Sequence, residues 1–121
     1  MAFFDRFHID VSVFVVNTIH LPNVKGIGND PSAQTLNWPY GLFSDSKSLW
    51  ITDTGNRRIL FYNNIPTENY AAADKVIGKP SFTTRDYNND EPIWPYSVKI
   101  NSKGQMAVSD TQFYRVLIWN N

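Results

Sequence analysis

The sequence has no cysteine among its 121 residues. Disulfide bonds, thiol catalysis and cysteine-based zinc sites are therefore excluded, while a chain without thiols tolerates reducing and oxidising compartments alike. Histidine is almost as scarce, since His8 and His20 are the only two, and neither lies in a repeated motif or beside a nucleophile signature. We therefore predict no catalytic residue, no cofactor-binding residue and no metal ligand.

An excess of charge of one sign is also lacking. The chain carries 11 basic and 11 acidic residues, so its formal net charge is zero. Duplex nucleic acid usually requires a basic patch, and a nucleic-acid partner is accordingly not expected. No stretch approaches the ~20 apolar residues of a membrane helix. Asp5 and Asp10 interrupt the N-terminal region, so neither a membrane span nor a signal peptide is predicted, and localisation stays unknown.

Aromatic residues are plentiful, at 15% of the chain, and they occur among many Asn, Ser, Thr and Pro residues. Aromatic and β-branched side chains pack well on pleated sheets, and the polar residues favour tight turns. The composition therefore favours an all-β fold.

The sequence also repeats. Residues 52–64 read TDTGNRRILFYNN and residues 109–121 read SDTQFYRVLIWNN, while Trp-Pro-Tyr occurs at 38–40 and again at 94–96. The first copy predicts four strands, at residues 41–44, 49–52, 58–63 and 75–79. The second copy predicts the equivalents of the first three, at residues 97–101, 106–109 and 115–120. Residues 11–16 are expected to form a further strand as a degenerate copy of 57–63, and residues 24–28 another, because they resemble 75–80. Short antiparallel strands joined by tight turns, repeated at such a period, are typical of β-propeller blades.

Four segments of the first copy resemble a known family, the NHL repeats. Residues 39–41 (PYG) and 51–59 (ITDTGNRRI) match the family's strand entry and its turn, and residues 64–67 and 76–82 resemble the long-period bacterial form. The resemblance covers roughly residues 11–121. The second copy departs from it at Ser97, Gln112 and Phe113.

The resemblance implies an all-β fold of four-stranded antiparallel β-propeller blades, a partial propeller with about two blades per chain. Residues 1–10 are then an N-terminal segment, 11–29 the outer strands of an incomplete blade, 36–82 a complete blade and 92–121 the start of the next. An extracellular or periplasmic location is implied by the resemblance only.

The residues that recur in both copies are expected to have structural roles. Asp53 and Asp110 are expected to accept hydrogen bonds from backbone N–H groups two residues on, as in an Asx-turn. Gly55, with Asn56, suits turn positions of positive φ. The second turn lacks these residues and is expected to be longer or differently twisted.

The repeated arginines, Arg58 and Arg115, are expected to pair with these aspartates or with a neighbouring blade. The functional alternative for the arginines is an anionic ligand. Trp38 and Trp94 precede prolines, which favour an extended backbone before them.

We predict partner binding at two kinds of position: aromatic residues that could line the propeller axis, and positions where the two copies of the repeat have different residues. Tyr40 and Tyr96 either pack between blades or line the mouth of the propeller axis. Asn56 and Arg57 of the first copy are replaced by Phe113 and Tyr114 in the second, either as a binding patch or as a contact hidden from solvent.

Two hypotheses for function follow. The first is a non-catalytic interaction or structural module, either part of a longer propeller or several copies in one assembly, in which the N-terminal strands of one chain complete the last blade of its neighbour. The alternative is a metal-dependent lyase or hydrolase with its site on the propeller axis, as in some relatives, although no His cluster supports it. Residues 86–91 have a calcium-loop spacing without the central glycine and are expected to be a solvated loop.

Overall fold

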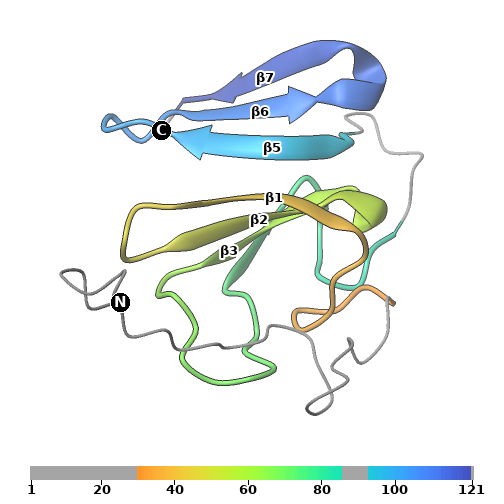
Figure 1. Ribbon diagram of the computed structural model, residues 1–121. Helices are drawn as coiled ribbons and strands as arrows, with labels where there is room; N and C mark the ends of the chain where they lie inside the picture. The colour runs from red at the N-terminus through yellow and green to blue at the C-terminus, as the bar shows by residue number, and fades with distance from the viewer. Residues whose placement is uncertain (1–29, 86–92, 121) are drawn as a thin grey trace, which may run out of the picture.

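The computed structural model describes residues 30–85 and 93–120, which form an all-β structure of two antiparallel sheets (Figure 1). The first sheet has the order β1 (Pro39–Ser44), β2 (Leu49–Asp53), β3 (Arg58–Tyr62) and β4 (Lys75–Ile77). The second sheet has the order β5 (Pro95–Ile100), β6 (Met106–Asp110) and β7 (Arg115–Trp119). No α-helix occurs within these two ranges.

The seven predicted strands in the described ranges are present, with shifts of a few residues at their ends. β1 and β5 begin earlier than predicted, at the prolines of the two Trp-Pro-Tyr motifs. β4 ends at Ile77, because Gly78 turns the backbone with a φ of 96°. The segments 1–10 and 11–29 and the loop 86–91 of the sequence analysis lie outside the described residues.

The two sheets have the same internal register. Asp53 lies opposite Arg58 and Asp110 opposite Arg115, and the first two strands of each sheet have an irregularity just after Pro39 and Pro95. The sequence repeat is therefore also a structural repeat of three strands. The two sheets do not close into a ring, so the all-β class is shown and the propeller arrangement stays a prediction.

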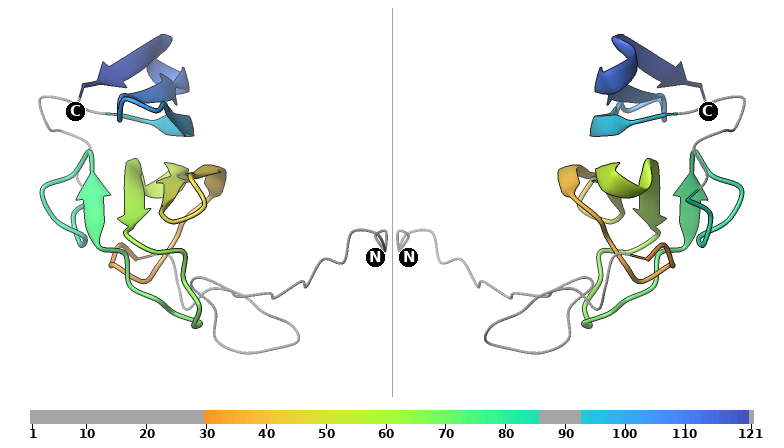
Figure 2. Two further views of the ribbon diagram at one scale, coloured as in Figure 1. Left: turned by 90° about the vertical axis from the view of Figure 1, so that its left-hand side faces the viewer. Right: turned by 90° about the vertical axis from the view of Figure 1, so that its right-hand side faces the viewer.

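The sheets pack against each other as a wedge. β5 contacts β1 and β2, and the sheets diverge from there toward β4 and β7, as the edge-on views show (Figure 2). The core between them has Ile59 on one side and Val98, Met106 and Val108 on the other, with partly buried aromatic residues around it. Apolar side chains on alternate strand positions thus point into the wedge.

The far face of the first sheet has a second core. Ile51, Leu60 and Tyr62 are buried there with Ala73, which lies outside the strands. Leu36 and Phe82, from the loops before β1 and after β4, pack against the same cluster. Loops therefore cover this face of the first sheet.

Candidate functional site

Asp53 is the centre of a buried polar network that ties the turn of the first sheet to the chain before β1. Its Oδ1 accepts the backbone N–H of Asn37 at 2.6 Å, and its Oδ2 accepts Arg58 Nε at 2.7 Å and Asn56 Nδ2 at 2.9 Å. The Asx-turn predicted for Asp53 is therefore wrong, because the carboxylate accepts the backbone N–H of Asn37, sixteen positions earlier, whereas the N–H of Gly55, two residues on, donates to the carbonyl of Asn37.

Arg58 lies inside the fold, and the two terminal nitrogens of its guanidinium donate to backbone carbonyls. Nη1 donates to the carbonyl of Phe82 at 2.5 Å, and Nη2 donates to the carbonyls of Ser32 at 2.8 Å and Thr35 at 3.0 Å. The side chains of Arg58 and Asp53 are both fully buried. Four of the five N–H groups of Arg58 are thus bonded inside the fold, and the fully buried side chain is not accessible to an anionic ligand in solvent.

The second sheet repeats the pair in a more open setting. Arg115 Nε donates to Asp110 Oδ2 at 2.6 Å, and Trp94 N donates to Asp110 Oδ1 at 2.5 Å. The predicted pairing of each arginine with its own aspartate is therefore confirmed. The Arg115 side chain is 44% exposed, whereas the Arg58 side chain is fully buried.

The turn after each aspartate has the same backbone in both copies. Each turn is a single 3-10 turn, Thr54–Asn56 or Thr111–Phe113, closed by a left-handed residue, Arg57 with φ 57° or Tyr114 with φ 56°. Two predictions are thus wrong: the positive φ falls on Arg57 instead of Gly55 or Asn56, and the second turn is neither longer nor differently twisted.

A glycine is required at position 55 because there is no space for a side chain, and not because the backbone there has a positive φ. A Cβ on this residue would lie 2.6 Å from Asn37 Cγ and 2.7 Å from Asn37 O, a backbone atom that accepts the Gly55 N–H. Asn56 is fully buried and donates to Asp53, so it does not belong to the accessible partner-binding residues that we predicted.

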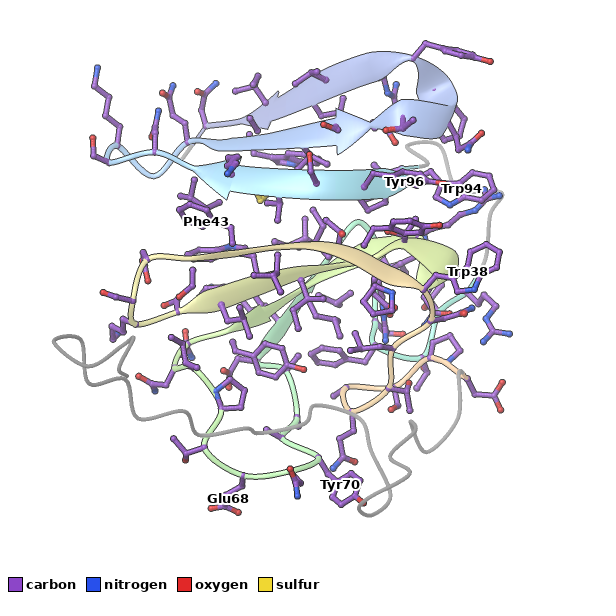
Figure 3. All side chains as sticks on the ribbon, viewed as in Figure 1. Trp38, Phe43, Glu68, Tyr70, Trp94 and Tyr96 are labelled. Atoms are coloured by element: carbon purple, nitrogen blue, oxygen red, sulfur yellow. The ribbon has the colours of Figure 1, made fainter. Side chains whose placement is uncertain are left out.

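The two Trp-Pro-Tyr motifs bring aromatic side chains together at one end of both sheets (Figure 3). The rings of Tyr40 and Tyr96 lie 4.8 Å apart, between the sheets, at an angle of 44°. Tyr40 is nevertheless 62% exposed, so it contributes to inter-sheet contact and to the surface at once. Trp38 is 66% exposed and has a φ of 53°, which overturns the extended backbone expected before Pro39.

Arg57 and the residues where the copies differ lie at this same end. The Arg57 guanidinium is centred 3.8 Å from the ring of Trp94, within the range of a cation–π contact. Tyr114 is 97% exposed, and Arg115 lies 5.3 Å from the ring of the exposed Phe113. We call this end of the two sheets the aromatic end, and it consists of Trp38, Tyr40, Arg57, Trp94, Tyr96, Phe113 and Tyr114.

Hydrogen bonds connect the two sheets beneath the aromatic end. Thr54 Oγ1 donates to the carbonyl of Pro95 at 2.6 Å, and Thr52 Oγ1 lies 3.3 Å from the carbonyl of Tyr96. A Cβ on Gly41 would lie 2.6 Å from that Tyr96 oxygen and 3.0 Å from Ser97 Cα. Gly41 therefore permits the close approach of β1 to β5.

A groove of about 740 Å³ opens between the sheets, and its lining comes from strand ends and the turns of the sheets. Aromatic side chains of β1, β2 and β7 line it together with aliphatic ones, and the polar rim includes Asp45; the apolar lining is Phe43, Trp50, Ile77, Ile100, Met106 and Trp119. Most of these residues also belong to the core between the sheets, so the groove is the open continuation of that core.

Among residues 30–85 and 93–120, Asp45 and Tyr62 have a shifted pKa. The backbone N–H of Ser48, and then that of Lys47, donate to Asp45 and hold the pKa of this carboxyl below its ordinary value of 3.8. Burial raises the pKa of Tyr62 to about 12 from an ordinary value of 10.0. The hydrogen bonds that lower the pKa of Asp45 stabilise the turn between β1 and β2. The raised pKa of Tyr62 results from its burial in the core on the far face of the first sheet. Neither shift indicates a catalytic group.

Metal ligands do not converge in the described part of the chain. No group of three or more His, Cys, Asp or Glu side chains is placed to hold an ion in residues 30–85 and 93–120. In the same ranges, no helix is long and apolar enough to cross a membrane.

The sequence matches no protein-family model and no curated protein sequence. The resemblance to NHL repeats therefore rests on the motifs alone. The aromatic end is the candidate functional site, because it combines exposed rings from both sheets with the guanidinium of Arg57.

Proposed function

We propose that the chain is a non-catalytic module of NHL-type propeller blades that acts as a protein-interaction or assembly unit. One observation carries the proposal: the aromatic end exposes Trp38, Tyr40 and Tyr114, and in the same set of residues Arg57 lies over the ring of Trp94. Tryptophan, tyrosine and arginine are the side chains that contribute most to protein–protein binding.

The electrostatics of the aromatic end support a protein partner. The two aspartates beneath it, Asp53 and Asp110, are fully buried and paired with arginines. The exposed surface is therefore aromatic with cationic groups, and the zero net charge of the chain disfavours polynucleotide. No observation on the described residues favours the alternative of a metal-dependent lyase or hydrolase.

Light scattering on the purified chain tests the assembly part of this proposal. We expect an oligomer whose mass rises with concentration, because two sheets leave apolar side chains such as Val116 and Ile118 in solvent. A well-folded, monodisperse monomer at all concentrations would contradict it. Elemental analysis of the same sample addresses the enzyme alternative, which requires a stoichiometric metal.

A further inference from the structure

The groove between the sheets lies at the end opposite the aromatic end. Phe43 lies between β1 and β5 at this end, whereas Trp38 and Trp94 lie at the other (Figure 3). The volume of the groove, about 740 Å³, is in the range of small-molecule sites, which is roughly 300–1,000 Å³. Protein interiors are otherwise close-packed, so an apolar opening of this size is a place where a ligand can lie.

Aromatic side chains from both sheets line the groove. The rings of Phe43 of β1 and Trp50 of β2 have centroids 5.7 Å apart, and Trp119 of β7 lines the groove from the second sheet. All three side chains are partly buried, so a part of each remains accessible. Aromatic faces attract cations through the ring quadrupole, and tryptophan does so most strongly.

Asp45, in the turn after β1, is the one charged side chain among the described residues that line the groove. Hydrogen bonds from the backbone N–H groups of Ser48 and Lys47 hold the pKa of its carboxyl below the ordinary value, so the carboxyl is ionised at neutral pH. The lysines of the two turns, Lys47 and Lys103, do not line the groove. The groove therefore places a negative charge beside aromatic rings, and it is complementary to a cation.

The amide oxygens on the rim are already engaged by the chain itself. Asn101 Oδ1 accepts the backbone N–H groups of Lys103 and Gln105, both at 2.9 Å. Asn120 Oδ1 accepts Gln105 Nε2 at 2.8 Å. A primary ammonium has three N–H donors to satisfy and would compete with these bonds. A quaternary ammonium has no N–H donor, so it needs only the ring faces and the negative charge.

We propose that the groove binds a small quaternary ammonium cation, with its alkyl groups against the three aromatic rings and its charge toward Asp45. Ile77, Ile100 and Met106 complete the apolar lining and cover the rest of the molecule. The site is separate from the aromatic end, so the inference goes beyond the proposed function and does not depend on it.

The four tryptophans of the chain report which end a ligand occupies. Trp50 and Trp119 line the groove, whereas Trp38 and Trp94 belong to the aromatic end. The test is a titration of the full chain with choline, followed by the indole N–H signals in a heteronuclear NMR spectrum. We expect saturable shifts of the two groove tryptophans, with a Kd on the order of 1 mM, and none of the other two.

The carbon analogue of choline tests whether the charge matters, because a tert-butyl group replaces the trimethylammonium and keeps its shape. We expect this neutral analogue to bind at least about fivefold more weakly than choline.

Asp45→Asn makes the same test on the protein, since it keeps an oxygen for the turn and removes the charge. We expect this variant to lose about fivefold in its affinity for choline. Glu68→Gln is the matched control, because it removes a carboxylate from the loop between β3 and β4, on the side of the first sheet away from the groove (Figure 3). This control should bind choline as wild type does.

Three results overturn the inference. The first is the absence of saturable shifts at Trp50 and Trp119 at choline concentrations about tenfold above the expected Kd. The second is a set of shifts confined to Trp38 and Trp94, which would place the cation at the aromatic end. The third is equal affinity for choline and its neutral analogue, or for wild type and Asp45→Asn. The mass measured by light scattering tests the proposed function independently of all three.

Discussion

Arg58 and Arg115 make the same ion pair in two different environments. Arg58 is sealed between β3 and two loops and holds three backbone carbonyls besides Asp53, whereas Arg115 has almost half of its side chain in solvent. Removing one partner of a buried pair leaves an uncompensated charge, while an exposed pair is screened by water. The pair in the first sheet should therefore stabilise the fold far more than its copy.

Substitution of each arginine by alanine tests this difference. Arg58→Ala is expected to lower the free energy of unfolding by about 3–5 kcal/mol, because Asp53 and three carbonyls lose their donor. Arg115→Ala is the matched comparison and is expected to lower it by about 1–2 kcal/mol, because the buried Asp110 loses only a half-exposed donor and keeps the Trp94 N–H. Urea denaturation of both variants measures the difference, and equal losses would contradict the environments described above.

Tyr62 predicts a pH dependence of stability. The unfolded chain releases the phenolic proton near pH 10, whereas the folded chain holds it up to about pH 12. Between these values the folded state binds more protons, so stability falls as pH rises, by at most about 1.4 kcal/mol per pH unit. Tyr62→Phe should abolish this part of the decline, measured by urea denaturation at pH 9, 10 and 11.

Tyr62→Phe also tests the buried hydroxyl at neutral pH. The hydroxyl has no hydrogen-bond partner within the described residues, so its removal should leave stability unchanged or raise it by up to about 2 kcal/mol. For the alkaline measurement, Tyr114→Phe is the control, since the substitution of this exposed tyrosine should leave the decline of stability with pH in place. A clear loss of stability in Tyr62→Phe at neutral pH would show that the hydroxyl has a partner.

At the level of single residues, recurrence in the sequence predicted the Asp–Arg pairs but not their surroundings. Two copies of Asp at the turn and Arg at the next strand are adjacent across a hairpin, so local geometry suffices for that contact. The bond from Asn37 to Asp53 and the burial of Asn56 depend on how the loop before β1 folds over the turn. No local pattern encodes the closure of this loop. An Asn three residues after the Asp could nevertheless have indicated a side-chain hydrogen bond between the two, as Asn56 makes to Asp53.

Among the elements, the strands follow from alternation of apolar residues, but the turns do not follow from their glycines. Turn residues are usually inferred from the need for positive φ, and that reasoning selected Gly55 and Asn56. Here Arg57 and Tyr114 take the left-handed conformation, while Gly55 serves the approach of Asn37. A turn can therefore keep its backbone after losing its glycine, as the second copy does with Gln112.

The contact of β1 with β5 depends on the missing side chain of Gly41. Gly41→Ser introduces the side chain that Ser97 has in the second sheet, and its Cβ would overlap the Tyr96 carbonyl. We expect a loss of about 1–3 kcal/mol in the free energy of unfolding, typical of overpacking. The reverse change, Ser97→Gly, should cost no more than about 1 kcal/mol, since Ser97 is exposed. Thermal denaturation of both variants compares the two losses.

Over the whole molecule, the two sheets share one core and are expected to unfold together. Val108 is fully buried between them, and Thr54 of the first sheet donates to Pro95 of the second. Val108→Ala should lower stability by about 2 kcal/mol while tryptophan fluorescence and far-ultraviolet circular dichroism still report one transition. Val116→Ala, at an exposed position of β7, is the control. Separate transitions for the two probes would show that the sheets fold independently.

The arrangement of the sheets was the part of the fold that strand patterns alone did not determine. Alternation assigns each strand two faces, but it does not say which face of one sheet meets which face of another. That pairing depends on Gly41 facing Tyr96 and on Thr54 facing Pro95, two contacts between residues far apart in sequence. Recurrence of a strand pattern indicates that copies stack, whereas the stacking surface emerges only from the packed side chains.

The wedge between the sheets has a consequence for any larger structure built by repeating it. Because the sheets meet at β1 and β5 and separate toward β4 and β7, each repetition of the step rotates the next sheet about the β1–β5 side. A straight stack would require the opposite strand edges to be equally close. Successive steps of this kind therefore have curvature built into them, and they bend toward a ring or a coil instead of extending as a flat fibre.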